Sequence, residues 1–220
     1  MKIDLSVLGR QYELHAAEYE MAALRALRSG WYIMGPELAG FEEAFAAYTG
    51  AKYAIGLNSG LDALSVAALG IGAGDEVIVP ANTYIATVLA VTANEAVPVF
   101  VEPDEYYSLD ASKLEAAITA RTCAIMPVHL YGQAVDMASV MTIAKRHHLA
   151  VIEDCAQSHG AHFGDVMTGR FGDIGCFSFY PTKNLGAFGD AGAIVTDDAA
   201  LAEKIRMLRN YGSKEKYHNE

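Results

Sequence analysis

The sequence predicts an α/β fold in three layers, α/β/α, with a mainly parallel sheet of seven strands in the middle. Short apolar runs rich in Val and Ile recur from about residue 52 onward, and stretches with the apolar spacing of helices separate them. The runs are apolar without alternation, which is typical of strands that helices cover on both faces. Strands that alternate with helices along a chain usually form a parallel sheet.

Each element has its own signal in the sequence. The strands are expected at residues 52–57, 76–80, 97–101, 123–128, 150–154, 175–179 and 192–196. Helices are expected at residues 61–69, 84–94, 111–118, 136–147 and 199–211. The first 50 residues also have a helical pattern. Residues 1–50 are therefore expected to form a helical segment packed on the sheet, and residues 51–220 the domain that contains the sheet.

Composition disfavours several classes of protein. The chain has 220 residues, 52% of them hydrophobic and 20% charged, which suffices for one domain with a full core. A net charge of −11 disfavours nucleic acid as a partner, because phosphate binding requires clustered Lys and Arg. No run approaches the roughly 20 apolar residues that span a bilayer, and the polar N-terminus does not resemble a signal peptide. Three scattered cysteines without a CxxC pair fit a cytoplasmic protein.

Polar residues follow several of the predicted strands. Ligands of open α/β sheets bind beyond the carboxyl ends of the strands, so these residues are expected to meet at one edge of the sheet. They are Asn58, Ser59 and Gly60; Asn82, Thr83 and Tyr84; His129; Asp154 and Gln157; and Ser178 and Lys183.

Three features of this set have both an ordinary and a chemical explanation. Residues 58–60 end a strand and begin a helix, which indicates either a simple N-cap or a phosphate site at the free N–H groups of a helix. Asp154 ends the most apolar strand, so its carboxylate needs an Arg, a metal ion or a protonated pyridine nitrogen as partner. Lys183 follows a strand, where a surface lysine is the ordinary case, but Pro181 and three nearby glycines shape its turn.

Taken together, the three features match the needs of pyridoxal 5'-phosphate: a lysine that forms an imine, a carboxylate facing the ring nitrogen, and a helix N-terminus for the phosphate. A metal site at Cys155, His159 and His162 is a weaker alternative, because it lacks a fourth ligand at zinc-like spacing. The glycines of residues 70–74 follow a helix and precede a strand, the reverse of the order in a dinucleotide site. A Ser-His-Asp hydrolase is disfavoured because there is no GxSxG motif.

Longer motifs resemble one enzyme family. Residues 153–161, EDCAQSHGA, and residues 178–186, SFYPTKNLG, are similar to motifs of the DegT/DnrJ/EryC1/StrS family, and residues 35–38, 58–64 and 79–84 also match in the expected order. The resemblance covers almost the whole chain. Members of this family are pyridoxal-phosphate-dependent aminotransferases of nucleotide-linked sugars with the aspartate aminotransferase fold. The resemblance therefore implies the large domain of fold type I.

The resemblance also implies a role for each residue around the cofactor ring. Lys183 forms the Schiff base with pyridoxal 5'-phosphate and then moves the proton between the substrate carbon and the cofactor. Asp154 pairs with the pyridine nitrogen, and Gln157 bonds to the ring hydroxyl. Ala156 and Tyr84 lie against the two faces of the ring. No metal ion is implied.

Further residues are expected at the phosphate and at the substrate mouth. The residues expected to hold the phosphate are Ser59, Gly60, Leu61 and Ser178. Relatives often have Thr where Leu61 stands, so this chain keeps the backbone N–H there but lacks the hydroxyl. The residues expected near the substrate mouth are His129, Tyr131 and His159.

The expected function is that of a cytoplasmic homodimeric aminotransferase with active sites at the dimer interface. It would transfer an amino group from glutamate to a keto group of a nucleotide-diphosphate sugar, with dTDP as the expected nucleotide. Family members with His in place of Lys183 act as dehydratases, so the lysine favours transamination over that alternative. The family continues into a small C-terminal domain, which is expected to be missing here. A truncated pyridoxal-phosphate-binding domain without turnover is therefore the second alternative.

Overall fold

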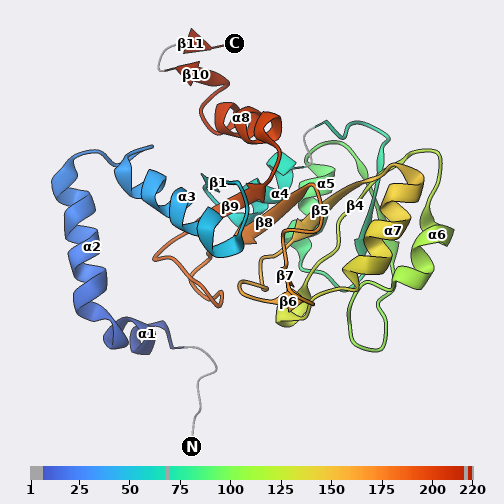
Figure 1. Cartoon of the computed structure of the whole chain (residues 1–220), viewed down its shortest axis with the longest axis horizontal. Coiled ribbons are helices and arrows are strands. Elements are labelled where there is room, and N and C mark those ends of the chain that lie inside the picture. The colour runs from blue at the N-terminus through green and yellow to red at the C-terminus, as the bar shows by residue number, and fades with distance from the viewer. Residues whose placement is uncertain (1–6, 68–69, 216–217, 220) are drawn as a thin grey trace, which may run out of the picture.

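The computed structural model describes residues 7–67, 70–215 and 218–219 and has three layers (Figure 1). The central sheet has seven strands in the order β1-β9-β8-β5-β4-β2-β3. Neighbouring strands are parallel from β8 to β3, whereas β9 is antiparallel to both β8 and β1. The expected α/β/α fold with a mainly parallel sheet is confirmed.

Six of the seven strands lie within one residue of their expected positions. The strands are β1 Tyr53–Leu57, β2 Glu76–Pro80, β3 Val97–Val101, β4 Thr122–Ile125, β5 Ala150–Asp154, β8 Ile174–Ser178 and β9 Gly192–Thr196. Strand β4 ends before the expected residue 128, because Pro127 has no N–H to donate and only accepts a bond, from Asp154 N–H at 2.9 Å. Short pairs outside the main sheet are β6 His162–Phe163 with β7 Val166–Met167, and β10 Ser213–Glu215 with β11 His218–Asn219.

The helices cover both faces of the sheet. On one face lie α4 Gly60–Ala67, α5 Ile85–Thr92 and α8 Ala199–Leu208; on the other lie α3 Pro36–Thr49, α6 Leu114–Ala117 and α7 Met137–His147. The expected helix at 111–118 is only a 3-10 turn, η1 Ala111–Lys113, followed by α6, and α8 ends three residues early. Residues 68–69 of the expected helix 61–69 lie outside the described residues. In the part of the chain that is described, no helix combines the length and apolar character needed to cross a bilayer.

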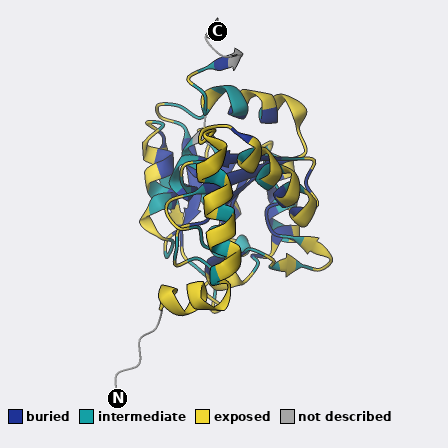
Figure 2. Ribbon diagram, turned by 90° about the vertical axis from the view of Figure 1, so that its left-hand side faces the viewer, coloured by how far each residue is buried: buried dark blue, intermediate teal, exposed yellow. Residues whose placement is uncertain are grey.

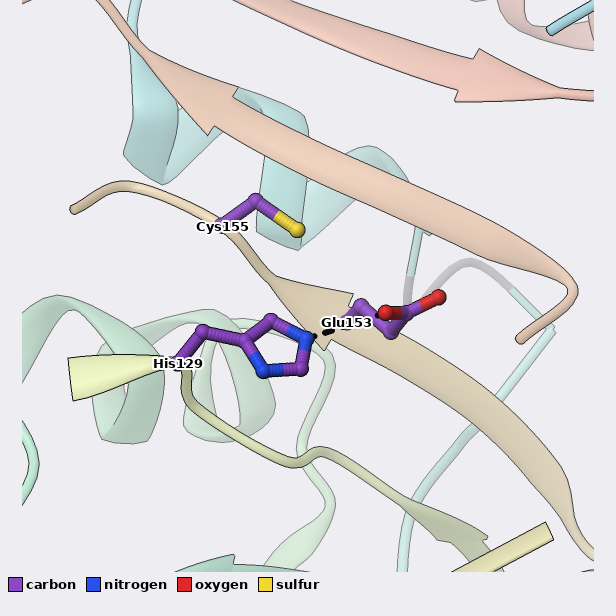
Figure 3. A group of neighbouring side chains, drawn as sticks. All are labelled: His129, Glu153 and Cys155. Carbon is purple, nitrogen blue, oxygen red and sulfur yellow. Dashed lines mark hydrogen bonds and ion pairs between the residues drawn. The ribbon is translucent and has the colours of Figure 1, made fainter. Parts of the chain in front are cut away.

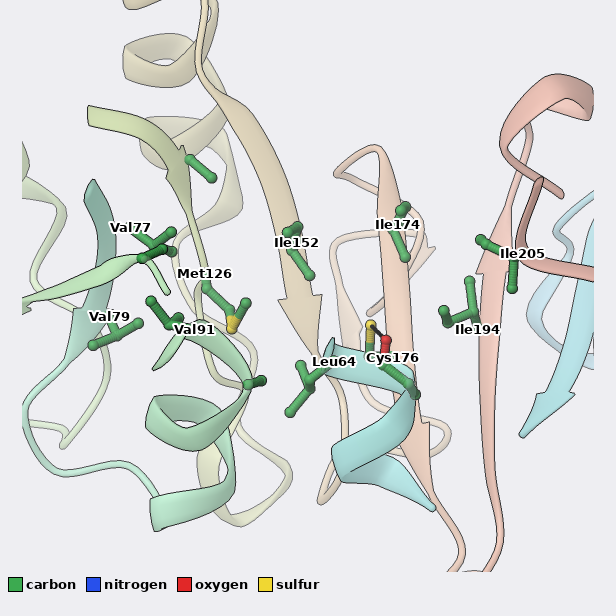
Figure 4. Close-up of a cluster of buried hydrophobic side chains, with 14 of the residues drawn as sticks. Leu64, Val77, Val79, Val91, Met126, Ile152, Ile174, Cys176, Ile194 and Ile205 are labelled. Carbon is green, nitrogen blue, oxygen red and sulfur yellow. Dashed lines mark hydrogen bonds between the residues drawn. The ribbon is translucent and has the colours of Figure 1, made fainter. Parts of the chain in front are cut away.

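Apolar side chains fill the space between the sheet and each helical layer. The larger cluster joins α4, α5 and α8 to the sheet and includes Leu64, Ile152 and Ile194 (Figure 4). Adjacent strand residues point to opposite faces, so Val151 lies in the cluster under α6 and α7, while Ile152 lies in the cluster under α4 and α5. The rigid layers hold the carboxyl ends of the strands in place.

The N-terminal segment differs in part from the expectation. Helix α3 packs on the sheet through Phe45, but α1 Leu8–Leu14 and α2 Ala16–Ser29 bury no residue. Figure 1 shows α2 standing apart from the sheet, and Figure 2, which faces that side, shows its exposed surface. Residues 1–6 lie outside the described residues. The described part of the segment is helical as expected, but only α3 packs on the sheet; α2 instead contacts the β8–β9 connection, where the ring of Tyr19 lies edge to face against Phe188 with centroids 4.9 Å apart.

We expect Leu64→Ala to lower the free energy of unfolding by about 2–5 kcal/mol, because the side chain is 2% exposed and its loss leaves a cavity between α4 and the sheet. The matched control is Leu89→Ala on α5, where the leucine is 45% exposed and a change of no more than about 0.5 kcal/mol is expected. Urea unfolding of both variants measures the difference. Equal losses in the two variants would contradict the assignment of Leu64 to the core.

Candidate active site

The sequence-predicted site residues come together at one edge of the sheet. Strands β2, β4, β5 and β8 are parallel, and β1 points the same way because β1 and β8 are both antiparallel to β9. The segments that leave the carboxyl ends of these strands carry the candidates Ser59, Gly60, Leu61, Tyr84, His129, Tyr131, Asp154, Ala156, Gln157, Ser178 and Lys183. The topology therefore assembles the set on one side of the molecule.

Asp154 is a buried carboxylate with partners on both oxygens. It is 4% exposed, Thr87 Oγ1 donates to its Oδ2 at 2.7 Å, and the Ala156 N–H donates to its Oδ1 at 3.1 Å. Burial raises the pKa of Asp154 above its ordinary value, and the bonds from Thr87 and Ala156 and the charge of Lys183 oppose that rise. The two bonds leave lone pairs on the carboxylate for a further donor, such as a protonated ring nitrogen.

Lys183 lies in a turn after β8, close enough to Asp154 for the two charges to interact. The turn is closed by the bond from Lys183 N–H to Tyr180 O at 2.8 Å, and a side chain at Gly186 would meet Pro181 O at 2.4 Å. Burial lowers the pKa of the Lys183 amine, and the negative charge of Asp154 partly restores it. A lowered pKa increases the fraction of free amine, which is the form that reacts with a carbonyl.

Gln157 is oriented by the backbone of Tyr131. The Tyr131 N–H donates to Gln157 Oε1 at 2.7 Å, so the amide NH₂ group is left as the donor toward a ligand. Tyr131 has a φ of 59°, in the left-handed region where a bulky residue is strained, and its side chain is 77% exposed. The arrangement fits an amide that donates to a ring hydroxyl.

The N-terminus of α4 supplies the anion-binding end of the site. Ser59 caps the helix: its Oγ accepts from Asp62 N–H and its carbonyl from Ala63 N–H, each at 3.0 Å. The N–H groups of Gly60 and Leu61 lie in the first turn of α4, where the helix has no carbonyl group to accept their hydrogen bonds. A phosphate would take both, and the positive end of the helix dipole would favour its charge.

Two glycines allow the close packing at this end. A Cβ at Gly60 would lie 2.5 Å from Ser178 Cβ, and a Cβ at Gly192 would lie 2.1 Å from Ser59 O. Only glycine fits at such separations, so α4, β8 and β9 meet at backbone distance. This contact brings the Ser178 hydroxyl beside the start of α4, where it would also reach a phosphate.

The expectation that His129 lies at the substrate mouth was wrong. Its side chain is 0% exposed, Nε2 lies 2.9 Å from Glu153 Oε2, and Nδ1 accepts the Val135 N–H at 3.1 Å (Figure 3). The bond to Nδ1 requires the proton on Nε2, so His129 donates to Glu153. Both ring nitrogens of His129 are therefore hydrogen-bonded inside the protein core. The residue stabilises the backbone beneath the site.

Glu153, His129 and Cys155 lie close enough together to resemble a metal site (Figure 3), but their chemistry is that of a hydrogen-bond network. Glu153 Oε1 accepts from the N–H groups of Phe171 and Gly172, each at 2.7 Å, and its Oε2 accepts from Gly169 N–H at 2.8 Å. Burial keeps the pKa of the Cys155 thiol well above its usual value, which disfavours the thiolate that a metal ion needs.

The alternative metal set of Cys155, His159 and His162 is not assembled as a group among the described residues. His159 Nδ1 lies 2.8 Å from Asn184 Oδ1, and Asn184 Nδ2 donates to His159 O at 3.1 Å. His162 pairs instead with the carbonyl of Gly160. His159 therefore ties its loop to the residue that follows Lys183, while its Nε2 has no hydrogen-bond partner among the described residues. The expected position of His159 near the substrate stays a prediction.

A cleft of about 960 Å³ adjoins the phosphate end of the site. Its walls include Met34 before α3, Asn58 after β1, Leu185 after the lysine turn and Arg209 after α8. Asp154 and Lys183 are not part of its lining. Asp154 and Lys183 therefore lie beside this cleft rather than inside it.

Comparison with known proteins agrees with this geometry. The model of the DegT/DnrJ/EryC1/StrS aminotransferase family matches residues 14–220. The chain belongs to this family. Members of the family are pyridoxal-phosphate-dependent aminotransferases of fold type I, which confirms the expected fold and the expected cofactor, pyridoxal 5'-phosphate. The residues described above fit that cofactor through a lysine, a buried carboxylate, an amide donor and a helix N-terminus.

Two curated relatives of this DegT/DnrJ/EryC1/StrS chain are sugar transaminases. The dTDP-3-amino-3,4,6-trideoxy-alpha-D-glucose transaminase of Streptomyces venezuelae is 55% identical over 97% of this chain and 57% of its own length. The dTDP-3-amino-3,6-dideoxy-alpha-D-galactopyranose transaminase of Aneurinibacillus thermoaerophilus is 56% identical over 99% of this chain and 60% of its own length. The chain thus spans about three fifths of the curated relatives it matches.

Solved structures with the same fold include two family relatives with bound intermediates or cofactor. The S. venezuelae DesV complex with a ketimine intermediate has a TM-score of 0.97 and 53% identity, over 100% of this chain and 60% of that one. The Bacillus subtilis NtdA structure with bound PMP has a TM-score of 0.94 and 36% identity, over 100% of this chain and 51% of that one.

Two residues of the site were missed in the sequence. Thr87 contacts Asp154 and is 0% exposed, and Glu153 is 0% exposed beneath the site. Each had a signal: Thr87 is a polar residue on a helix that is otherwise apolar from Ile85 to Val91, and Glu153 is a charge inside a buried strand. Buried polar groups of this kind require hydrogen-bond partners, so both positions predict a polar network next to the site.

We expect the Lys183 amine to react with acetic anhydride with a midpoint below pH 10.5, because its lowered pKa makes the free amine available at lower pH. In Asp154→Asn the midpoint should move lower still, because the negative charge that raises the Lys183 pKa is lost. Competitive labelling followed by mass mapping at each pH measures both midpoints. A midpoint that rises in Asp154→Asn would contradict the facing arrangement of the two residues.

Proposed function

We propose that this chain is the cofactor-binding part of an aminotransferase that transfers an amino group, from glutamate, to the keto group of a nucleotide-linked sugar. The convergence of Lys183, Asp154 and Gln157 with the α4 N-terminus at one edge of the sheet carries the proposal. Residues 51–220 form the large domain in this proposal.

Each residue of the site has a different role in this proposal. When bound, pyridoxal 5'-phosphate supplies an electron-accepting ring that stabilises negative charge on the substrate carbon. Asp154 would hold the proton on the ring nitrogen, and the Gln157 amide would donate to the ring hydroxyl. Lys183 Nζ would act as the nucleophile toward the cofactor's carbonyl group and would then carry the proton between the substrate carbon and the cofactor.

The relatives support a dTDP-linked keto sugar as the acceptor. The names of the two transaminases from S. venezuelae and A. thermoaerophilus both describe dTDP-linked sugars with an amino group at carbon 3. Lys183 opposes the dehydratase alternative, because that alternative is associated with a histidine at this position. The remaining alternative is a domain that binds the cofactor without turnover.

We expect borohydride reduction of the chain loaded with pyridoxal 5'-phosphate to place a phosphopyridoxyl group on Lys183, since its amine is half-buried beside Asp154. Peptide mass mapping locates the adduct. Lys183→Arg is the control and should lose this adduct, whereas adducts spread over exposed lysines in both proteins would count against the proposal.

Glutamate distinguishes turnover from binding alone. Added to the loaded chain, it should bleach the visible absorption of the bound cofactor and release 2-oxoglutarate. A chain that gives the Lys183 adduct but does not respond to glutamate would be a binder without turnover.

A cytoplasmic homodimer is the assembly that we propose for this enzyme. Its support is the apolar surface of α2, where Met21, Leu24 and Leu27 are 63%, 46% and 62% exposed. Three cysteines without a disulfide, two of them buried, are consistent with a reducing compartment. An apolar helix surface of this kind is typical of a protein interface.

We expect the double variant Leu24→Glu, Leu27→Glu to shift the chain from dimer to monomer, because charges are depleted in interface cores. Light scattering after size exclusion gives the mass. The control Val166→Glu adds a charge on the β6–β7 hairpin, at a side chain that is 42% exposed, and should leave the dimer intact. A monomeric unaltered chain would contradict the proposed assembly.

A further inference from the structure

A short chain of hydroxyl groups leads from the start of α5 to Asp154. Thr87 is 0% exposed, its Oγ1 lies 2.7 Å from Asp154 Oδ2, and Thr83 Oγ1 lies 2.7 Å from Thr87 Oγ1. The Thr87 N–H also donates to Tyr84 O at 3.1 Å, which fixes the first turn of the helix. The two threonines therefore connect the β2–α5 segment to the carboxylate at the end of β5.

The bonds of Thr87 differ from those of other helical threonines in this protein. A threonine inside a helix commonly donates to a backbone carbonyl three or four residues earlier. Thr49, Thr92 and Thr142 do this, with donations to Phe45 O, Leu89 O and Ala138 O at 2.9, 3.2 and 2.8 Å. Thr87 bonds instead to two side chains, so its hydroxyl serves the site rather than its own helix.

The direction of these bonds depends on the charge of Asp154. A hydroxyl has one proton to donate, and an ionised carboxylate can only accept. When Asp154 is ionised, Thr87 must donate to it and must accept from Thr83. Each bond polarises the next, so the two hydroxyls together favour the ionised carboxyl group.

Asp154 needs such support because burial favours its neutral form. The pKa of Asp154 is raised first by burial, and Thr87 is the largest of the contributions that lower it, ahead of the Ala156 N–H, Lys183 and His129. Hydrogen bonds to a charged acceptor are stronger than those between neutral groups. Thr87 is thus the protein group that most opposes the rise of the Asp154 pKa.

We propose that Thr87, polarised by Thr83, is a positioning residue that holds Asp154 as a carboxylate against the ring nitrogen of the cofactor. The inference rests on the proposed function, since it assigns a partner to the residue that faces the ring. Thr87 is not proposed to touch the cofactor or the substrate. It acts through Asp154, by keeping that carboxylate able to hold a proton on the ring nitrogen.

The test compares four variants loaded with pyridoxal 5'-phosphate labelled with ¹⁵N in the ring. Thr87→Val keeps the shape and removes the hydroxyl, Thr87→Ser keeps the hydroxyl, and Thr83→Val removes the second donor. The control, Thr92→Val, removes an exposed hydroxyl from the same helix. The ¹⁵N resonance reports whether the ring nitrogen is protonated, and a binding titration gives the dissociation constant of the cofactor.

We expect Thr87→Val to move the ¹⁵N resonance toward that of an unprotonated ring nitrogen and to weaken cofactor binding about ten-fold or more, as for the loss of one hydrogen bond to a charged group. Thr83→Val should move the resonance in the same direction by less. Thr87→Ser should restore the resonance, and Thr92→Val should match the unaltered chain. Circular dichroism and thermal unfolding of each unloaded variant show whether it is folded.

Several outcomes would overturn the inference. A folded Thr87→Val with an unchanged ¹⁵N resonance means that the threonine is only structural, even if the cofactor binds less tightly. If Thr87→Val does not fold, an unchanged resonance in Thr83→Val has the same meaning. In either case a Lys183 adduct in the unaltered chain shows that the proposed function still stands. If that adduct is absent, the proposed function fails first and the inference fails with it.

Discussion

Two neighbouring carboxylates are buried at the end of β5, and the arrangement of the site follows from how each is satisfied. Glu153 and Asp154 point to opposite faces of the sheet, as adjacent strand residues must. A buried charge is costly unless it is hydrogen-bonded. Glu153 receives three backbone N–H groups and the His129 ring, whereas Asp154 receives one hydroxyl and one N–H. The saturated carboxylate is structural, and the one with acceptor capacity left is the one that we propose to face the cofactor.

The saturated carboxylate also organises the surroundings of the other. Through Gly169, Phe171 and Gly172 it holds the segment between β7 and β8, and through His129 it holds the segment after β4. The His129 N–H in turn donates to Asp154 O at 3.1 Å. The backbone that carries Asp154 is therefore fixed from both neighbouring strands, which explains how a loop-built site stays rigid.

Much of this arrangement could be predicted from the sequence, for identifiable reasons. The strands are buried on both faces, so their apolar runs are unbroken and easily located. Asp154 and Lys183 stand out because each interrupts or follows such a run. The position of α2 could not be predicted, since an amphipathic pattern does not say what covers it. His129 was misplaced because it follows a predicted strand in the sequence. Its burial depends on Glu153, which is distant in sequence, and on Val135, whose loop gives no signal of the contact.

The antiparallel strand β9 has a consequence for the order in which the site forms. Lys183 lies on the connection between β8 and β9, which pair as neighbours, so this part of the site depends on contacts of short sequence separation. Strand β1 pairs with β9 alone among the described strands, more than 130 residues later in the chain. Contacts of long separation form slowly. During synthesis on the ribosome, β1 can pair only after β9 has emerged, so the approach of Ser59 to Gly192 at the proposed phosphate end of the site depends on this late pairing.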